Sequence, residues 1–219
     1  MIHAMQAAIF DLDGVIVDTA KYHFLAWKRL AHEMGFDFSE KDNERLKGVS
    51  RDRSLEILLE IGGKTVDAAA RQALAERKNG WYVEYIQRMD RSELLAGTEQ
   101  YLDKIRRLGI KTALGSASKN APIIIDRLGI APLFDTVIDG TQVTRAKPDP
   151  EVFQRAAAKL GILPQNCVVF EDAVAGIQAA LRAGMGAVGI GKPGNLPEAD
   201  VVIEGLYQLV ILGQGRLTQ

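Results

Sequence analysis

Two aspartates, Asp11 and Asp13, follow the apolar run AAIF near the start of the sequence and precede a glycine and a second apolar run. A carboxylate can act as a nucleophile, as a general acid or base, or as a ligand of a metal ion. Open α/β sheets bind their ligands at the carboxyl ends of their strands. The position therefore favours a chemical site, although Asp-Gly between two apolar runs is also typical of a hairpin turn.

Other reactive side chains follow apolar runs later in the chain. Ser116 follows IKTALG, Lys147 comes after TVID in the segment RAKPDP, and Glu171 and Asp172 follow CVVF. If these runs are parallel strands, their carboxyl ends share one edge of a sheet and the side chains converge there. Crowded carboxylates repel each other, so a cation is expected among them, and oxygen ligands suit Mg²⁺. Magnesium with a lysine and a serine would bind a phosphoryl group.

Two other interpretations of motifs in the sequence are rejected. A calcium-binding loop starting at Asp11 is excluded, because Leu12 and Gly14 have the wrong positions and Tyr22 stands in place of the terminal glutamate. The segment GIGKPG, at 189–194, matches the dinucleotide pattern G-x-G-x-x-G after a predicted strand. Prolines interrupt any helix after it and too little chain remains for a βαβ unit, so we expect a turn there.

The elements that must position these residues alternate in the second half of the chain. Strands are predicted over IKTALGS, TVID, CVVF and AVGIG, and AAIF supplies another. Helices are predicted from about Glu99 to Gly109, over NAPIIIDRLG, from an N-cap at Asp149 to Gly161, and over AVAGIQAALRAG. Helices between short apolar strands imply right-handed βαβ units and a parallel sheet.

The segment 18–87 interrupts this alternation, because it contains no convincing strand pattern. In KYHFLAWKRLAHEMG the apolar residues recur at helical spacing, and further helices fit 51–61 and 67–87. The sequence therefore predicts an α/β protein with a Rossmann-like, doubly wound parallel sheet core, formed by 1–17 and 88–219. An all-α helical cap domain is inserted into it at 18–87.

Composition narrows the class of protein. Apolar residues make up 47% of the chain, and 27 basic residues against 28 acidic ones leave a net charge of −1 with no basic tract. We therefore expect no nucleic-acid partner. The one cysteine, Cys167, is expected to be buried in a strand. We identify no signal peptide or membrane span, so a soluble cytoplasmic protein is expected.

The four groups DLDGV, the strand end at Ser116, Lys147-Pro148 and Glu171-Asp172 resemble the ordered motifs of the haloacid dehalogenase superfamily of phosphotransferases. A closer resemblance, to the sugar-phosphate mutases of this superfamily, covers LKGVSRDRSLEILLEIGG, RKN, DTAKYHFLAW, GSASKNAP and EDAVAGIQA. Its sugar-phosphate phosphatases share the four core motifs but usually lack KGVSR. The chain from about residue 191 onward carries no motif that we recognise.

The resemblance implies roles for the core residues. Asp11 would be the nucleophile that forms an aspartyl phosphate, and Asp13 the general acid and base for the sugar oxygens. Asp11, the main-chain carbonyl of Asp13, Glu171 and Asp172 would bind Mg²⁺. Ser116 and Lys147 would hold the oxygens of the transferring phosphoryl group.

The resemblance also implies residues that bind the substrate. Arg51 would grip the distal phosphate from the cap, and His23 and Lys78 would position Asp13. The full expected set is Thr19, His23, Trp27, Lys47, Gly48, Val49, Ser50, Arg51, Lys78, Ala117, Ser118, Lys119 and Asn120. Simpler readings stay open: Arg51 as a solvated helix start, His23 on the polar face of its helix, and Lys78 as a surface charge.

The function implied is the interconversion of β-D-glucose 1-phosphate and D-glucose 6-phosphate through a bisphosphate intermediate. The alternative within the superfamily is a magnesium-dependent sugar-phosphate phosphatase. A non-enzymatic regulator on the same scaffold would not need Asp11, Asp13 and Lys147 together. The expected partners are small sugar phosphates, with no membrane and no nucleic acid, and the protein is expected to be a monomer.

Overall fold

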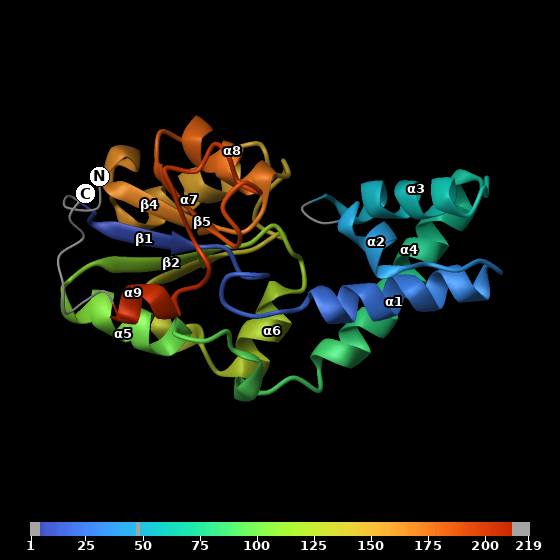
Figure 1. Cartoon of the computed structure of the whole chain (residues 1–219), viewed down its shortest axis with the longest axis horizontal. Coiled ribbons are helices and arrows are strands. Elements are labelled where there is room, and N and C mark those ends of the chain that lie inside the picture. The colour runs from blue at the N-terminus through green and yellow to red at the C-terminus, as the bar shows by residue number, and fades with distance from the viewer. Residues whose placement is uncertain (1–4, 47–48, 212–219) are drawn as a thin grey trace. The chain divides into compact units, whose positions relative to one another are not determined.

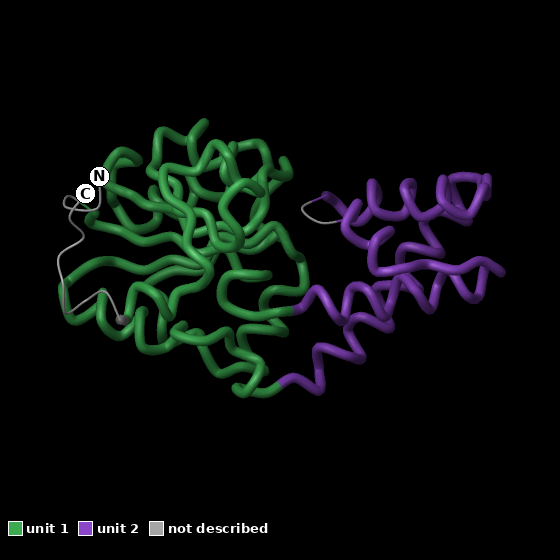
Figure 2. The backbone as a smooth tube through the Cα atoms, viewed as in Figure 1, with its two compact units in different colours: residues 1–18, 90–219 green, residues 19–89 purple. Residues whose placement is uncertain are grey.

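The chain divides into two compact units. The structure is a computed structural model that describes residues 5–46 and 49–211. Unit 1 comprises Met1–Asp18 and Asp90–Gln219, and unit 2 comprises Thr19–Met89. Figure 2 shows unit 1 in green and unit 2 in purple. The insertion predicted from the sequence spans 18–87, so its ends lie within two residues of the limits of unit 2.

Unit 1 contains a parallel sheet of six strands in its described part. The strands are β1 (Ala7–Phe10), β2 (Lys111–Gly115), β3 (Thr136–Ile138), β4 (Cys167–Glu171), β5 (Gly186–Ile190) and β6 (Val201–Ile203). Their order is β3-β2-β1-β4-β5-β6, and every neighbouring pair is parallel. The order reverses direction beside β1, which is the topological switch point of a doubly wound fold. The predicted fold class is confirmed.

The edge strand β6 is an element that the sequence analysis did not predict. It has three residues, pairs only with β5 among the described strands, and leaves Val201 exposed. A run this short gives no readable alternation of apolar and polar residues. Between β5 and β6 the chain forms turns and bends without a helix, so the expectation of a turn at GIGKPG is confirmed.

Helices cover both faces of the sheet. In unit 1 they are α5 (Thr98–Arg107), α6 (Ala121–Leu128), α7 (Glu151–Leu160), α8 (Val174–Arg182) and α9 (Tyr207–Ile211). Short 3₁₀ turns span Arg91–Glu93, Ala131–Leu133 and Pro164–Asn166. Figure 1 shows α7 and α8 on one face, and α5 and α9 on the other.

The predicted ends of these helices agree with the structure, except at the start of α7. Gly129 and Gly161 end α6 and α7 in the left-handed conformation, as a C-terminal glycine does. The N-cap of α7 is Pro150 and not Asp149, because the first helical hydrogen bonds are accepted by the carbonyl oxygen of Pro150. The Asp149 carboxylate still accepts the Glu151 N–H at 3.0 Å.

Strand β1 is buried on both faces, which explains its continuous apolar run. Ala7 and Ile9 belong to the core cluster beneath α7 and α8, together with the buried thiol of Cys167. Burial raises the pKa of that thiol to about 11. On the other face Phe10 stacks on Phe170, with ring centroids 4.7 Å apart. The expectation of a buried strand thiol is confirmed.

In the described residues of unit 2, the regular elements are all helices. Its helices are α1 (Ala20–Glu33), α2 (Glu40–Glu44), α3 (Arg51–Ile61) and α4 (Ala68–Ile86), and both α1 and α3 pack against α4. Side chains of Ser39, Ser50 and Asp67 accept backbone N–H groups at the starts of α2, α3 and α4. Across both units, the described part of the chain holds no helix that could span a membrane.

Candidate active site

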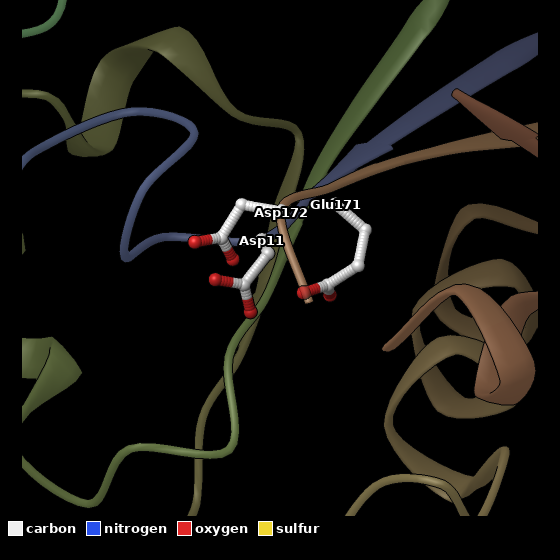
Figure 3. A group of neighbouring side chains, drawn as sticks. All are labelled: Asp11, Glu171 and Asp172. Carbon is white, nitrogen blue, oxygen red and sulfur yellow. The ribbon is translucent and has the colours of Figure 1, made fainter. Parts of the chain in front are cut away.

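Three carboxylates meet at the carboxyl edge of the sheet. Asp11 follows β1, Glu171 ends β4 and Asp172 comes next, and each offers an oxygen within 4.8 Å of the others. Figure 3 shows the three side chains directed toward a common space. The cause is the sheet register: β1 and β4 are parallel neighbours with Phe10 opposite Phe170, so the residues that follow lie side by side.

Lys147 joins this cluster from the segment between β3 and α7. Its ammonium lies 2.5 Å from Asp11 Oδ1 and 2.8 Å from Glu171 Oε2, and its side chain is 9% exposed. Burial alone would lower the pKa of Lys147, but the charges of Asp11 and Glu171 outweigh burial and raise it. Lys147 therefore stays charged where a phosphoryl group would need a positive partner.

The acidic side of the cluster carries more charge than one ammonium neutralises. Burial raises the pKa of Glu171. Desolvation of its carboxyl group likewise raises the pKa of Asp172, although the residue as a whole is exposed, and the charges of Glu171, Asp11 and Asp13 add to this. Converging carboxylate oxygens are the donor set that Mg²⁺ prefers. The residues present therefore fit a divalent cation.

Two glycines leave room for these carboxylates. A Cβ on Gly14, whose φ is 78°, would lie 2.1 Å from Asp172 Oδ2. A Cβ on Gly176, inside α8, would lie 2.0 Å from the carboxyl carbon of Glu171. Neither glycine was predicted from the sequence to have this role. The available signal was Gly176, because a glycine inside a predicted helix lowers helix propensity and needs a packing reason.

The chain turns sharply after β1 and does not form a hairpin with it. Gly14 N–H donates to the Val17 carbonyl at 2.8 Å, and Ile16 N–H donates to the Leu12 carbonyl at 3.0 Å. Val17 then pairs with Leu94, while β1 itself pairs with β2 and β4. The hairpin reading of Asp-Gly is therefore wrong, and Asp13 sits half-buried in the turn.

The segment 116–120 links β2 to α6 at the same sheet edge. Ser116 Oγ accepts the N–H of Ser118 at 3.1 Å, and Ser118 Oγ accepts the N–H of Asn120 at 3.2 Å. Ser116 and Asn120 are buried, while Ala117 and Lys119 are exposed. The segment ends at the N-terminus of α6, where backbone N–H groups and the helix dipole favour an anion.

In unit 2 the structure brings His23, Trp27 and Lys78 together. Lys78 is 2% exposed, and its ammonium lies 2.8 Å from His23 Nδ1 and over the rings of Trp27 and Tyr82. The interpretation of Lys78 as a surface charge is therefore wrong, and His23 is half-buried with its ring stacked on that of Tyr82. An ammonium has no acceptor, so Nδ1 accepts and the ring proton lies on Nε2. Burial, then the charges of Lys78 and Arg51, lowers the pKa of His23.

The remaining predicted residues of unit 2 lie on α1 and around the start of α3. Thr19 is the buried N-cap residue of α1, and Ser50 Oγ accepts the Arg53 N–H at the start of α3. Arg51 is the first residue of α3 and is half-buried, which lowers its pKa. Val49 is exposed. Lys47 and Gly48 lie outside the described residues.

The acidic cluster, its lysine and the doubly wound sheet define a class of protein. A model of the haloacid dehalogenase-like hydrolase family matches residues 5–184. The chain belongs to this family, as the resemblance in the sequence implied.

Individual proteins show which enzymes of this family the chain is similar to. The chain is 44% identical over 209 residues to the β-phosphoglucomutase of Bacillus subtilis, covering 94% of this chain and 92% of that protein. A crystal structure of β-phosphoglucomutase from Clostridium difficile matches with a TM-score of 0.87 at 43% identity, covering 94% and 93% of the two chains. A phosphorylated carbohydrates phosphatase of Thermotoga maritima is 32% identical over 184 residues, covering 83% and 82%. The closer resemblance to sugar-phosphate mutases is therefore confirmed.

Proposed function

We propose that this protein interconverts β-D-glucose 1-phosphate and D-glucose 6-phosphate, the activity of a β-phosphoglucomutase. The observation that carries this proposal is the 44% identity to the Bacillus enzyme over 94% of the chain, which spans both units. The site in unit 1 supports it, because a buried carboxylate paired with a lysine suits phosphoryl transfer.

The first proposed step is attack by Asp11 on a phosphoryl group of glucose 1,6-bisphosphate. The bond from phosphorus to Asp11 forms as the bond from phosphorus to the sugar oxygen breaks, and Asp13 protonates the departing sugar oxygen. Lys147 and Ser116 hold the phosphoryl oxygens, and Lys147 keeps its charge beside Asp11 for this purpose. Asp11, Glu171 and Asp172, with the main-chain carbonyl of Asp13, would hold Mg²⁺, which when bound adds positive charge beside the transferring group. The covalent aspartyl phosphate divides a difficult transfer into two easier steps.

The second proposed step returns the phosphoryl group to the sugar. Asp13 takes the proton from the attacking sugar hydroxyl and, in the opposite direction, protonates the leaving sugar oxygen. β-Glucose 1,6-bisphosphate forms in between, and it must exchange its two phosphates between the reacting and distal positions. The protein therefore needs a second phosphate-binding group, for which we propose Arg51, Ser118, Lys119 and Asn120.

The other proposed substrate contacts lie mainly on unit 2. Lys78 holds His23 neutral and fixes its Nε2–H as a donor, which suits it to orient Asp13 or a sugar oxygen. The remaining proposed contacts are Thr19, Trp27, Lys47, Gly48, Val49, Ser50 and Ala117.

A sugar-phosphate phosphatase is the second candidate, supported by the 32% identity to the Thermotoga phosphatase. The two activities differ in what attacks the aspartyl phosphate, which is water in a phosphatase and a sugar hydroxyl in a mutase.

Phosphorus NMR with α- and β-glucose 1-phosphate supplied separately tests the proposal. A mutase of this specificity converts only the β anomer to glucose 6-phosphate, given magnesium and a catalytic amount of glucose 1,6-bisphosphate. Accumulation of inorganic phosphate at the expense of glucose 6-phosphate would identify a phosphatase instead.

A further inference from the structure

Lys147 lies in a segment without helix or strand, yet its ammonium is held against two carboxylates. The chain from 142 to 150 consists of turns and bends. Such a segment has no repeating hydrogen bonds to define its path, so side chains must supply them. The contacts that hold this segment identify what directs Lys147.

Glu151, the first residue of α7, supplies most of these contacts. Its Oε2 accepts the backbone N–H of Thr144 at 3.0 Å, the Thr144 hydroxyl at 3.0 Å and the backbone N–H of Arg145 at 2.9 Å. Its Oε1 accepts from Arg155, with the closest nitrogen at 2.7 Å. The Glu151 side chain is buried. Burial opposes ionisation, but these hydrogen bonds outweigh it and lower the pKa of Glu151 to about 2.

Further contacts hold the other side of Lys147. The carbonyl oxygen of Pro148 accepts from Arg182 at 3.0 Å. Phe153 lies in the first turn of α7 and is fully buried, and the centroid of its ring is 4.7 Å from the Lys147 ammonium. Lys147 is thus flanked by one segment tied to Glu151 and another tied to Arg182.

We infer that Glu151 is a positioning residue for Lys147, whose carboxylate folds the segment 144–149 so that the ammonium points between Asp11 and Glu171. The proposal rests on the proposed function only in that Lys147 takes part in phosphoryl transfer. The two oxygens of Glu151 have separate tasks, because Oε2 binds the segment and Oε1 binds Arg155. Arg155 is 51% exposed, so Arg155→Gln is a matched control that leaves the segment contacts in place.

The first test does not use activity. Amines of the folded protein are acetylated with a trace of acetic anhydride, and the modification of Lys147 is measured by mass spectrometry. Glu151→Ala raises the reactivity of Lys147 on the order of tenfold relative to an exposed lysine, since the ion pairs that shield it are lost. Arg155→Gln leaves Lys147 protected. Equal protection in Glu151→Ala and the parent overturns the proposal.

Glu151→Asp is a second variant, which keeps the proposal testable if Glu151→Ala does not fold. It keeps the negative charge at the start of α7, where the helix dipole favours it, but is too short to reach the Thr144 and Arg145 N–H groups. It exposes Lys147 in the same direction as Glu151→Ala. A Glu151→Asp protein that folds and keeps Lys147 fully protected contradicts the proposal.

The second test is a double-mutant cycle on the phosphorylation of Asp11 by acetyl phosphate. Glu151→Ala slows this step on the order of 10²-fold, the scale of a misplaced catalytic group. In a Lys147→Ala background the same change costs less than about threefold, because the group that Glu151 positions is gone. Equal losses in both backgrounds show that Glu151 acts on the protein generally and overturn the inference. Neither test depends on sugar specificity, so a failed mutase assignment remains distinguishable.

Discussion

At the scale of single residues, Asp11 stands between one ammonium and two carboxylates. Lys147 attracts its charge while Glu171 and Asp172 repel it. The contact with Lys147 fixes the direction of the Asp11 carboxylate, which is what a nucleophile requires.

Asp11→Asn is expected to abolish turnover and leave the fold intact. The amide has nearly the same shape, but it cannot form an acyl phosphate. Labelled acetyl phosphate should place its label on Asp11 in the parent and on no residue of the variant, as read by peptide mass spectrometry. Asp103→Asn, at an exposed position on α5, is the matched control and should keep full activity. Recovery of the label at another residue would contradict the assignment of Asp11.

Gly176→Ala is expected to inactivate the protein, whereas a glycine-to-alanine substitution at a helical position with open space around it is not. The added methyl group overlaps the Glu171 side chain and must displace it from the cluster. Gly80, inside α4, has open space around its Cβ position. Gly80→Ala should therefore raise stability, by about 0.5–1 kcal/mol, because alanine favours helices. Thermal unfolding and turnover of both variants check this, and an active Gly176→Ala protein would show that Glu171 can move without loss.

At the scale of elements, α1 and α4 bury a lysine against a histidine and two aromatic rings. An ammonium removed from water costs free energy, which contacts such as the hydrogen bond to His23 and the cation–π contacts must offset. A helix pair built for stability alone would be expected to hold an apolar side chain at this position. The buried charge therefore indicates a role in binding or chemistry.

Lys78→Met tests this difference between function and stability. Methionine fills a similar volume without the desolvation cost, so the unfolding temperature should stay equal or rise. Turnover of β-glucose 1-phosphate should fall on the order of 10²-fold, because His23 loses the donor that fixes its proton on Nε2. Acetyl phosphate, which carries no sugar, should still phosphorylate Asp11. Lys64→Met, at an exposed position of unit 2, is the control, and unchanged sugar turnover in Lys78→Met would refute the role.

The segment before α7 makes a pH-dependent contribution to stability. The pKa of Glu151 falls from an ordinary value of 4.5 to about 2 in the folded protein. A carboxyl group with a lowered folded-state pKa stabilises the protein above its unfolded pKa, and this stabilisation is lost as the pH falls toward the folded value. Glu151→Gln should therefore lower the unfolding temperature at pH 6 and have a shrinking effect between pH 4.5 and 2. A difference that stays constant across this range would contradict the assignment.

At the scale of the whole molecule, the two units carry different parts of the proposed task. Unit 1 holds the proposed nucleophile Asp11, Lys147 and the acidic cluster, whereas unit 2 holds Arg51 and the pair His23 and Lys78. Phosphorylation of Asp11 by a small phosphate donor needs only the residues of unit 1. A mutase also needs the residues of unit 2, because binding energy from the distal phosphate must help to exclude water from the aspartyl phosphate.

Arg51→Ala should change the fate of the aspartyl phosphate as well as the rate. Loss of a charged phosphate contact should weaken sugar-phosphate turnover by about 2–4 kcal/mol. It should also lower the ratio of transfer to hydrolysis, while the reaction with acetyl phosphate changes little. The measurement is the partition of labelled aspartyl phosphate between β-glucose 1-phosphate and water. An unchanged partition would mean that Arg51 does not sense the distal phosphate, and a parent protein that sends most label to water would be a phosphatase.

The sequence by itself determined the parallel sheet, the helical insertion and the order in which carboxylates follow the strands. These follow from local patterns: short apolar runs alternate with helices, and parallel strands bring their carboxyl ends to one edge. The edge strand β6 was not predicted, because three residues are too few to show a periodic pattern. The N-cap of α7 lies one residue later than predicted, because the ends of helices depend on individual hydrogen bonds.

Only the tertiary structure decided how the charged side chains are partnered. Lys147 and Asp11 lie 136 residues apart in the chain, and Lys78 and His23 lie 55 apart. No local pattern specifies such pairs, because burial and partnership depend on which distant segments meet. The same holds for the space beside Gly176 and for Glu151, whose hydrogen bonds to Thr144 and Arg145 no local pattern specifies.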